Sequence, residues 1–165
     1  MKDTDIAYIA GLIDGEGYIG IKKSSVRKDC VNPNYHARIQ IRMVEEQAIK
    51  FIAETLGGSY YKEKAHCNNG RPLYCYQASD KIAEETLKKV LPYLKVKEHS
   101  AKKVLELREL QKNCRKYQTK ITGYRTLNHW CGKPVKVANK SFSDEYIAMC
   151  ESLYHECKRL NAVGI

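Results

Sequence analysis

The most constraining feature of the sequence is an apolar segment near its start that ends in two glycines. Residues 3–14 predict a helix, because Thr4 or Asp5 can cap it and the residues that follow are apolar nearly all round. Such a helix is expected to be buried on all sides, and in a chain of 165 residues a second copy could cover one of them. Gly15 and Gly17 are expected to end the helix and turn the chain.

Alternating residues after this helix predict strands. Residues 18–24 place Ile19 and Ile21 on one face, and residues 36–44 alternate more sharply. The remaining expected elements are a helix over 45–56, a strand pair over 59–65 and 73–78, and helices over 80–91, 98–114 and 143–161. This order, α-β-β-α-β-β-α with a helical tail, predicts an α+β fold. We expect one structural domain, with a core over residues 1–110 and a basic linker and C-terminal helix over 111–165.

The distribution of charge indicates a polyanionic partner. The net charge is +10. Residues 112–143 contain Lys133, Lys136 and Lys140 among other cations, interleaved with aromatic residues, and no Asp or Glu. A one-signed stretch of this kind is typical of a surface that contacts phosphates, so we expect DNA contact there. The alternative is a basic connector between helices.

The cysteines and the N-terminus bear on compartment. Seven cysteines without a C-x-x-C pair favour free thiols in a reducing, intracellular setting. We expect no membrane partner, because the chain lacks a signal-peptide pattern and an apolar run of roughly 18 residues. Two sets without finger spacing could form a zinc site: Cys114, His129 and Cys131, or Cys150, His155 and Cys157. Core packing on an apolar helix face explains Cys150 and Cys157 without metal.

The segment Ile9-Ala10-Gly11-Leu12-Ile13-Asp14-Gly15-Glu16-Gly17 resembles the signature of the LAGLIDADG homing endonuclease family. The resemblance implies an αββαββα fold with a four-stranded antiparallel DNA-binding sheet. A single motif in a short chain implies a homodimer that cuts double-stranded DNA at a long pseudo-palindromic site. In the family, two such helices pack side by side, and small residues permit close approach. The residues expected at this dimer interface are Ala7, Ala10, Gly11 and Asp14.

The resemblance also implies a metal-dependent active site. Glu16 of each copy would lie near the centre as a metal ligand, and the backbone carbonyl of Gly15 would join it. Two nearby carboxylates repel unless a cation lies between them, and oxygen ligands suit Mg²⁺. Mn²⁺ is a plausible substitute and Ca²⁺ a non-catalytic one. Asp14 is instead interpreted as a helix-end acid that bonds backbone groups near the dimer axis.

Two further positions are carried over from the family as catalytic residues. The segment from Leu91 to Lys97 resembles a family segment whose final lysine reaches the active site, which implies a role for Lys97. A polar residue at the start of the second helix corresponds to Glu45 or Glu46, with Gln47 as the occupant if the alignment slips. The helix dipole explains acids at this position equally well.

DNA reading is expected from the polar faces of the strands, since a β-ribbon fits the major groove and long donors read base edges. The candidates, including three from the loop after the first strand, are Lys22, Ser24, Arg27, Lys28, Asn32, Arg38, Gln40, Arg42, Lys62, Lys64, Tyr74 and Tyr76. Alternatives to a nuclease are a catalytically inactive nucleic-acid-binding protein or an intron maturase with intron RNA as partner. A further alternative is an unrelated enzyme or small structural domain that matches the motif by chance.

Overall fold

The computed structural model describes residues 2–25, 32–63, 72–128, 132 and 134–163. The first half of the chain forms two strand pairs, each preceded by a helix. Its elements are α1 (Asp3–Glu16), β1 (Gly17–Lys23), β2 (Tyr35–Met43), α2 (Glu46–Leu56), β3 (Ser59–Glu63) and β4 (Leu73–Ser79). The second half contains α3 (Asp80–Val90), η1 (Leu91–Tyr93), α4 (Glu98–Lys112), η2 (Cys114–Tyr117), β5 (Gln118–Asn128), β6 (Pro134–Phe142) and α5 (Asp144–Val163).

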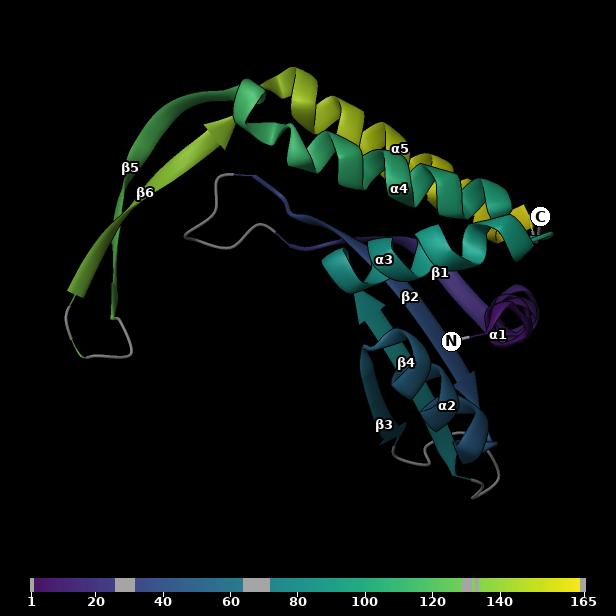
Figure 1. Ribbon diagram of the computed structural model, residues 1–165. Coiled ribbons are helices and arrows are strands. Elements are labelled where there is room, and N and C mark those ends of the chain that lie inside the picture. The colour runs from purple at the N-terminus through teal and green to yellow at the C-terminus, as the bar shows by residue number, and fades with distance from the viewer. Residues whose placement is uncertain (1, 26–31, 64–71, 129–131, 133, 164–165) are drawn as a thin grey trace.

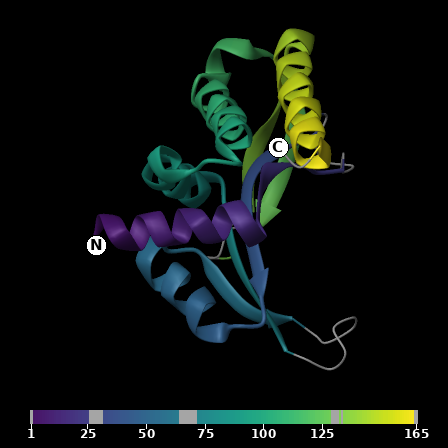
Figure 2. The ribbon, with the colours of Figure 1, turned by 90° about the vertical axis from the view of Figure 1, so that its right-hand side faces the viewer.

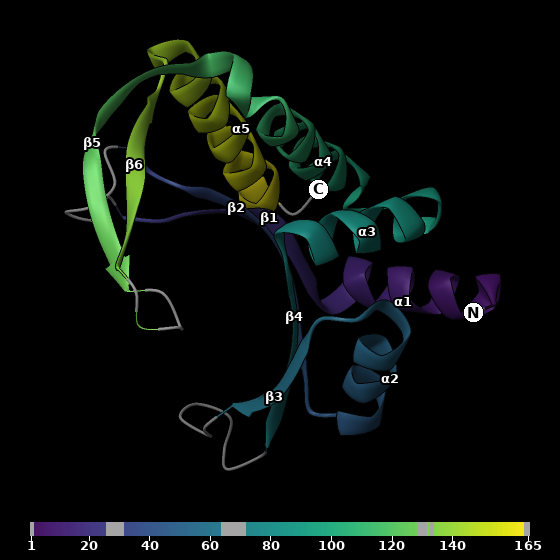
Figure 3. The ribbon, with the colours of Figure 1, turned by 60° about the vertical axis from the view of Figure 1, so that its left-hand side comes forward.

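The first four strands form an antiparallel sheet in the order β1-β2-β4-β3. All the α-helices lie on one side of this sheet, and its other face is open (Figures 1 and 3). In Figure 2, α1 lies across the helical layer, with α2 on one side and α3 to α5 on the other. The expected α+β fold with a four-stranded antiparallel sheet and a C-terminal helix is confirmed.

The core lies between this sheet and the helices. Ile19, Ile39 and Ile41 point from the sheet into it and are fully buried. Their partners include Ile9 and Ile13 of α1. The alternation of β1 and β2 therefore separates an apolar, helix-covered face from a polar, open one, as period-two patterning requires.

The end of α1 differs from the expectation. The helix continues through Glu16, so Gly15 is a helical residue and only Gly17 ends it. A Cβ at Gly17 would lie 2.6 Å from the carbonyl oxygen of Ile13, which makes glycine necessary there. A Cβ at Gly15 would meet nothing within 4 Å. The turn from helix into β1 therefore depends on one of the two glycines.

One side of α1 is uncovered in the single chain. Ala7, Tyr8, Gly11 and Gly15 are exposed there. Ala10, by contrast, is fully buried in the core of its own chain. The prediction that Ala10 lies at a helix–helix interface between copies is therefore wrong, because no second chain can reach a side chain enclosed by its own core.

The basic segment after α4 contains a pair of strands in its described residues, so it is more than a simple connector between helices. After the short helix η2, β5 and β6 pair with each other as a separate two-stranded antiparallel sheet. This hairpin extends beyond the ends of α4 and α5 (Figure 1).

The last helix belongs to the main core. Tyr146, Cys150, Leu153 and Cys157 of α5 are buried in the same cluster as α1. The side-chain amide of Asn161 donates to the carbonyl oxygen of Ile19 at 2.9 Å, which fastens α5 to β1. Core packing thus accounts for Cys150 and Cys157. Among the described helices, none is both long and apolar enough to cross a membrane.

Candidate active site and nucleic-acid interface

Glu16 stands at the exposed C-terminal end of α1. It is the last helical residue, and the Gly17 turn then directs the chain into β1. Within the described part of the chain, no hydrogen bond or ion pair engages its carboxylate. A carboxylate at a helix C-terminus faces the negative end of the helix dipole, so it gains little from its own helix. Both of its oxygens are therefore available to an external cation.

The Glu16 carboxylate borders a basic hollow. This hollow has a volume of about 550 Å³, and Glu16 shares its lining with Lys22, Arg38, Gln40 and Arg42 of β1 and β2. Tyr154 and Lys158 of α5 complete one side. The arrangement places an exposed carboxylate at the edge of a basic surface whose side chains can hold phosphates.

Asp14 connects α1 to the segment that carries Lys97. Its carboxylate accepts backbone N–H hydrogen bonds from Lys95 at 2.7 Å, Val96 at 3.2 Å and Lys97 at 2.9 Å. Hydrogen bonds to a carboxylate are stronger than neutral ones. Asp14 is thus a helix-end acid that bonds backbone groups, as interpreted from the sequence, and its carboxylate points into its own chain.

The Lys97 side chain returns to the end of α1. Its Nζ donates to the carbonyl oxygens of Ile13, at 2.9 Å, and of Asp14. Burial lowers the pKa of this ammonium, while the nearby carboxylates of Asp14 and Glu16 act in the opposite direction. The predicted catalytic pair, Glu16 and Lys97, is therefore brought together at one end of α1.

Glu45 has a structural task at the junction of β2 and α2. It is the N-cap of α2, and its carboxylate accepts a hydrogen bond from the backbone N–H of Gln47 at 3.2 Å. Glu46 bonds Tyr60 and Lys50 on the helical side of the molecule. Capping explains Glu45 without a catalytic role, in line with the helix-dipole interpretation.

The open face of the sheet carries most of the predicted β1 and β2 contacts. Cross-strand partners in the register place Lys22, Arg38, Gln40 and Arg42 on this face. Arg38 donates to the amide oxygen of Gln77 at 2.8 Å. Arg42 pairs with Glu63 at 2.9 Å. These contacts hold long donors in place before any nucleic acid binds.

Three predicted contacts lie on the wrong face. The register pairs Lys62 with Tyr74 and Tyr76 with Ile41, which places all three on the helix-covered side. Tyr76 is fully buried, and the Lys62 ammonium lies over the Tyr74 ring at 5.9 Å. Tyrosine and lysine suit either face of a half-buried strand, so the sequence alone did not reveal the phase of β3 and β4.

The residues that occupy the open face in their place were missed. They are Tyr61 of β3 and Cys75, Gln77 and Ser79 of β4. The signal that could have identified them was Ala78: a small apolar residue next to polar Gln77 and Ser79 fits the core face and sets the phase of β4. Cys75 is covered by its neighbours, and Gln40 donates to its sulfur at 3.1 Å.

The remaining candidates lie at the distal end of β1 and β2 or outside the described residues. Ser24 is half-buried beside Lys22, His36 and Arg38. Asn32 accepts a hydrogen bond from the backbone N–H of Phe142 at 3.1 Å, so it braces the hairpin. Lys136 is exposed on β6. The predicted contacts outside the described residues are Arg27, Lys28, Lys64 and Lys133, together with the side chain of Lys140.

The donor set of one chain is incomplete for a metal. The described residues contain no group of three or more His, Cys, Asp or Glu that could hold an ion. Glu16 with the Gly15 carbonyl therefore fits a divalent cation only if a second copy or a phosphate supplies further oxygens. One predicted zinc set fails, because Cys150 and Cys157 are buried while His155 is exposed and bonded to Glu151. The other set includes His129 and Cys131, which lie outside the described residues.

Comparisons with known proteins agree with this geometry. A family model described as LAGLIDADG endonuclease matches residues 9–114. A comparison with curated proteins found no match. Among solved structures, the homing endonuclease I-CvuI in complex with the I-CreI target in the presence of Mg is 19% identical, with a TM-score of 0.65 over 96% of this chain and 83% of that one. I-CvuI with its own target in the presence of Ca is 24% identical, with a TM-score of 0.58 over 68% and 71% of the two chains.

A third similar structure is an archaeal intron-encoded homing endonuclease, I-Vdi141I, complexed with DNA. It is 17% identical, with a TM-score of 0.67 over 97% of this chain and 86% of that one. At these identities the likeness establishes the fold. The match to the family model covers more than half of the chain and includes Glu16, Lys97 and the four strands of the main sheet.

Proposed function

Because this chain belongs to the LAGLIDADG endonuclease family, we propose that it is a homing endonuclease that cuts double-stranded DNA as a homodimer with Mg²⁺. The observation that carries the proposal is the position of Glu16. Its carboxylate, which has no hydrogen-bond or ion-pair partner among the described residues, adjoins a hollow lined by Lys22, Arg38, Gln40 and Arg42. A surface of this composition holds a duplex by its phosphates and base edges, and it presents one acid to the backbone.

Two copies are needed to complete the site. The exposed face of α1 presents Ala7, Gly11 and Gly15, which let a second helix backbone approach closely. Packing the two faces together would bring the two Glu16 carboxylates near one axis. Their mutual repulsion favours a bound cation between them. Twofold symmetry of the protein then implies a pseudo-palindromic target.

Different residues of the chain have separate roles in the proposed phosphodiester hydrolysis. Glu16 and the Gly15 carbonyl would hold the metal, with Mn²⁺ able to substitute and Ca²⁺ binding without turnover. A bound Mg²⁺ supplies Lewis-acid stabilisation of phosphate charge and activation of water. Lys97 directs its side-chain nitrogen to the same end of α1 as Glu16, and in its protonated form it would stabilise the charge that develops on the phosphate. Asp14 fixes the backbone from which Lys97 extends.

The test is a selection of cleaved molecules from a randomised duplex library, with Mg²⁺ or Ca²⁺ and with Glu16→Gln. The matched control is Glu54→Gln, at an exposed position of α2. We expect the wild type and the control to cut a long pseudo-palindromic site with Mg²⁺ and not with Ca²⁺. The Glu16→Gln variant is expected to bind this site without cutting it. Equal cutting by Glu16→Gln would overturn the mechanism. Specific retention of DNA or intron RNA without cutting by any protein would favour an inactive binding protein or a maturase.

A further inference from the structure

The β5–β6 hairpin lies outside the part of the chain that the family match covers. That match ends at residue 114, and β5 begins at Gln118. In the described residues its strands pair with each other and with no strand of the main sheet. An isolated hairpin of this length is marginally stable in water. Its presence beyond the core therefore calls for a reason other than the fold of the core.

The base of the hairpin is firmly attached. The backbone N–H of Ser143 donates to the Tyr117 carbonyl oxygen at 2.8 Å, which closes the base. Phe142 packs against Tyr146 of α5, with ring centroids 4.7 Å apart. Asn32, from the loop after β1, accepts the Phe142 N–H. The direction of the hairpin is therefore set by α5 and by the distal end of the main sheet.

The strands carry exposed apolar and cationic side chains. Tyr124 is 67% exposed, and the register places it on the same face as Thr126 and Lys136, which are also exposed. Ile121 and Val135 are exposed as well. No acid occurs anywhere in residues 112–143. An exposed aromatic ring beside a lysine, in a segment without acids, suits a surface that packs against sugar and pairs with phosphate.

The position of the hairpin fits the outer part of a bound duplex. It extends on the side of the sheet that no helix covers (Figure 3). Its base contacts Asn32, near the end of β1 opposite Glu16. The length of β1 separates those two ends by roughly 20 Å, more than half a turn of DNA. A duplex lying along the open face would therefore meet the hairpin well beyond the scissile phosphates.

We propose that this hairpin binds the DNA backbone at the outer flank of each half-site, where it adds affinity without base reading. The inference rests on the proposed function, since it assumes a duplex on the open face. It assigns the DNA that flanks the sequence-read site as the partner of β5 and β6. The charge of the hairpin is complementary to phosphate.

The first experiment places a photoreactive phenylalanine analogue at position 124 of the full-length protein. The probe is a random-sequence duplex library in Ca²⁺, which keeps the DNA uncut. We expect crosslinks from position 124 and none from the same analogue at Ile82, which is exposed on α3 on the helical side. Absence of crosslinks at 124 while the protein still binds the library would overturn the proposal. Crosslinks to structured RNA in place of duplex DNA would also overturn it.

The second experiment measures the salt dependence of binding to the same library. Lys120, Lys136 and Lys140 are changed together to Gln, with Lys81, Lys89 and Lys102 of α3 and α4 as an equal-charge control. We expect the hairpin variant to lower the slope of log K against log salt by up to about 0.9 for each phosphate that the protein no longer neutralises. An unchanged slope would overturn the proposal. Crosslinking without Mg²⁺-dependent cutting would reject only the proposed function, whereas cutting without crosslinking would reject only the hairpin's role.

Discussion

At the scale of single residues, Asp14 and Lys97 form a reciprocal connection. The Asp14 carboxylate accepts the N–H groups of residues 95–97, and the Lys97 ammonium donates to carbonyl oxygens at the end of α1. The Asp14 side chain satisfies backbone N–H groups just before α4, and the Lys97 side chain satisfies backbone carbonyl groups at the end of α1. The position of Lys97 therefore depends on Asp14, although Asp14 itself would touch neither metal nor DNA.

We predict that Asp14→Ala slows DNA cleavage by about tenfold to a hundredfold at saturating DNA. The physical reason is that Lys97 loses its fixed backbone, while the sheet face that binds DNA is unchanged. The measurement is single-turnover cleavage of wild type, Asp14→Ala, Lys97→Ala and the double variant. If Asp14 acts through Lys97, the double variant is no slower than Lys97→Ala. Rate reductions that multiply across the two sites would contradict the assignment.

At the scale of helices and strands, some elements could be predicted from the sequence and others could not. β1 and β2 were found because Ile19, Ile39 and Ile41 alternate with long polar residues. The sequence did not show which residues of β3 and β4 face the helices, because Lys62, Tyr74 and Tyr76 are amphipathic and fit both faces. The hairpin was not predicted, because its cations and glycines interrupt the pattern of its β-branched residues. The end of α1 was predicted to within two residues, since only steric contact with Ile13 distinguishes Gly17 from Gly15.

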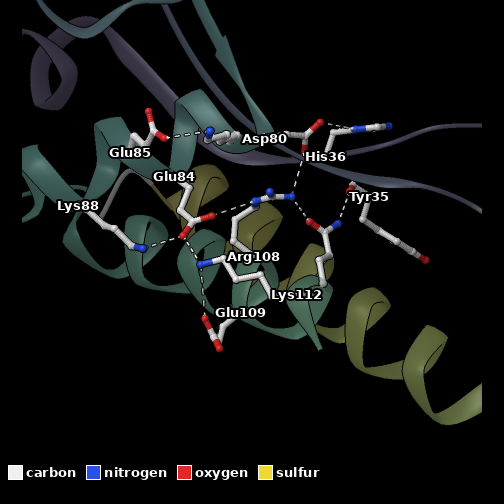
Figure 4. A network of polar contacts seen from close by, with 11 residues as sticks. Tyr35, His36, Asp80, Glu84, Glu85, Lys88, Arg108, Glu109 and Lys112 are labelled. Carbon is white, nitrogen blue, oxygen red and sulfur yellow. Dashed lines mark hydrogen bonds and ion pairs between the residues drawn. The ribbon is translucent and has the colours of Figure 1, made fainter. Parts of the chain in front are cut away.

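A buried acid fastens α3 to α4, and α4 in turn to β2. Glu84 contacts Lys88 at 2.7 Å, Lys112 at 2.5 Å and Arg108 at 3.5 Å (Figure 4). Arg108 also approaches Asp80, which bonds His36 of β2 at 2.9 Å. Hydrogen bonds from Lys112 and Lys88 lower the pKa of Glu84 to about 2. The network thus holds the helices against the strand that carries Arg38 and Gln40.

We predict that Glu84→Gln lowers the free energy of unfolding by about 1–3 kcal/mol at neutral pH, because it removes the buried charge that Lys88, Lys112 and Arg108 share. The control Glu85→Gln, on the exposed side of α3, should change it by less than about 0.5 kcal/mol. The measurement is urea unfolding across a pH series. Because the folded-state pKa is depressed, the contribution is full above the ordinary carboxyl pKa and is lost as pH falls towards 2. A destabilisation that is independent of pH would mean that packing, and not charge, is responsible.

At the scale of the whole molecule, the uncovered side of α1 is the surface through which the proposed homodimer would assemble its active site. Ala7, Gly11 and Gly15 recur every fourth residue and so share one helix face. Exposed glycines weaken an isolated helix by about 1 kcal/mol each relative to alanine. Within the single chain nothing approaches a Cβ built at either glycine within 4 Å. In the proposed dimer, close contact with a second copy would give these residues a role that they lack in the single chain.

We predict that Gly11→Leu converts a dimer into a folded monomer. A Cβ at position 11 has no atom of its own chain within 4 Å, and leucine has a higher helix propensity than glycine, so the circular dichroism spectrum and melting temperature should be maintained or improved. Between two copies it would hold the helices apart. The measurement is light scattering after size exclusion over a concentration series. The control is Ala148→Leu, at an exposed position of α5. A dimeric Gly11→Leu would exclude this face as the interface. A monomeric one should also lose double-strand cutting, because each chain brings only its own Glu16 to a site that needs both.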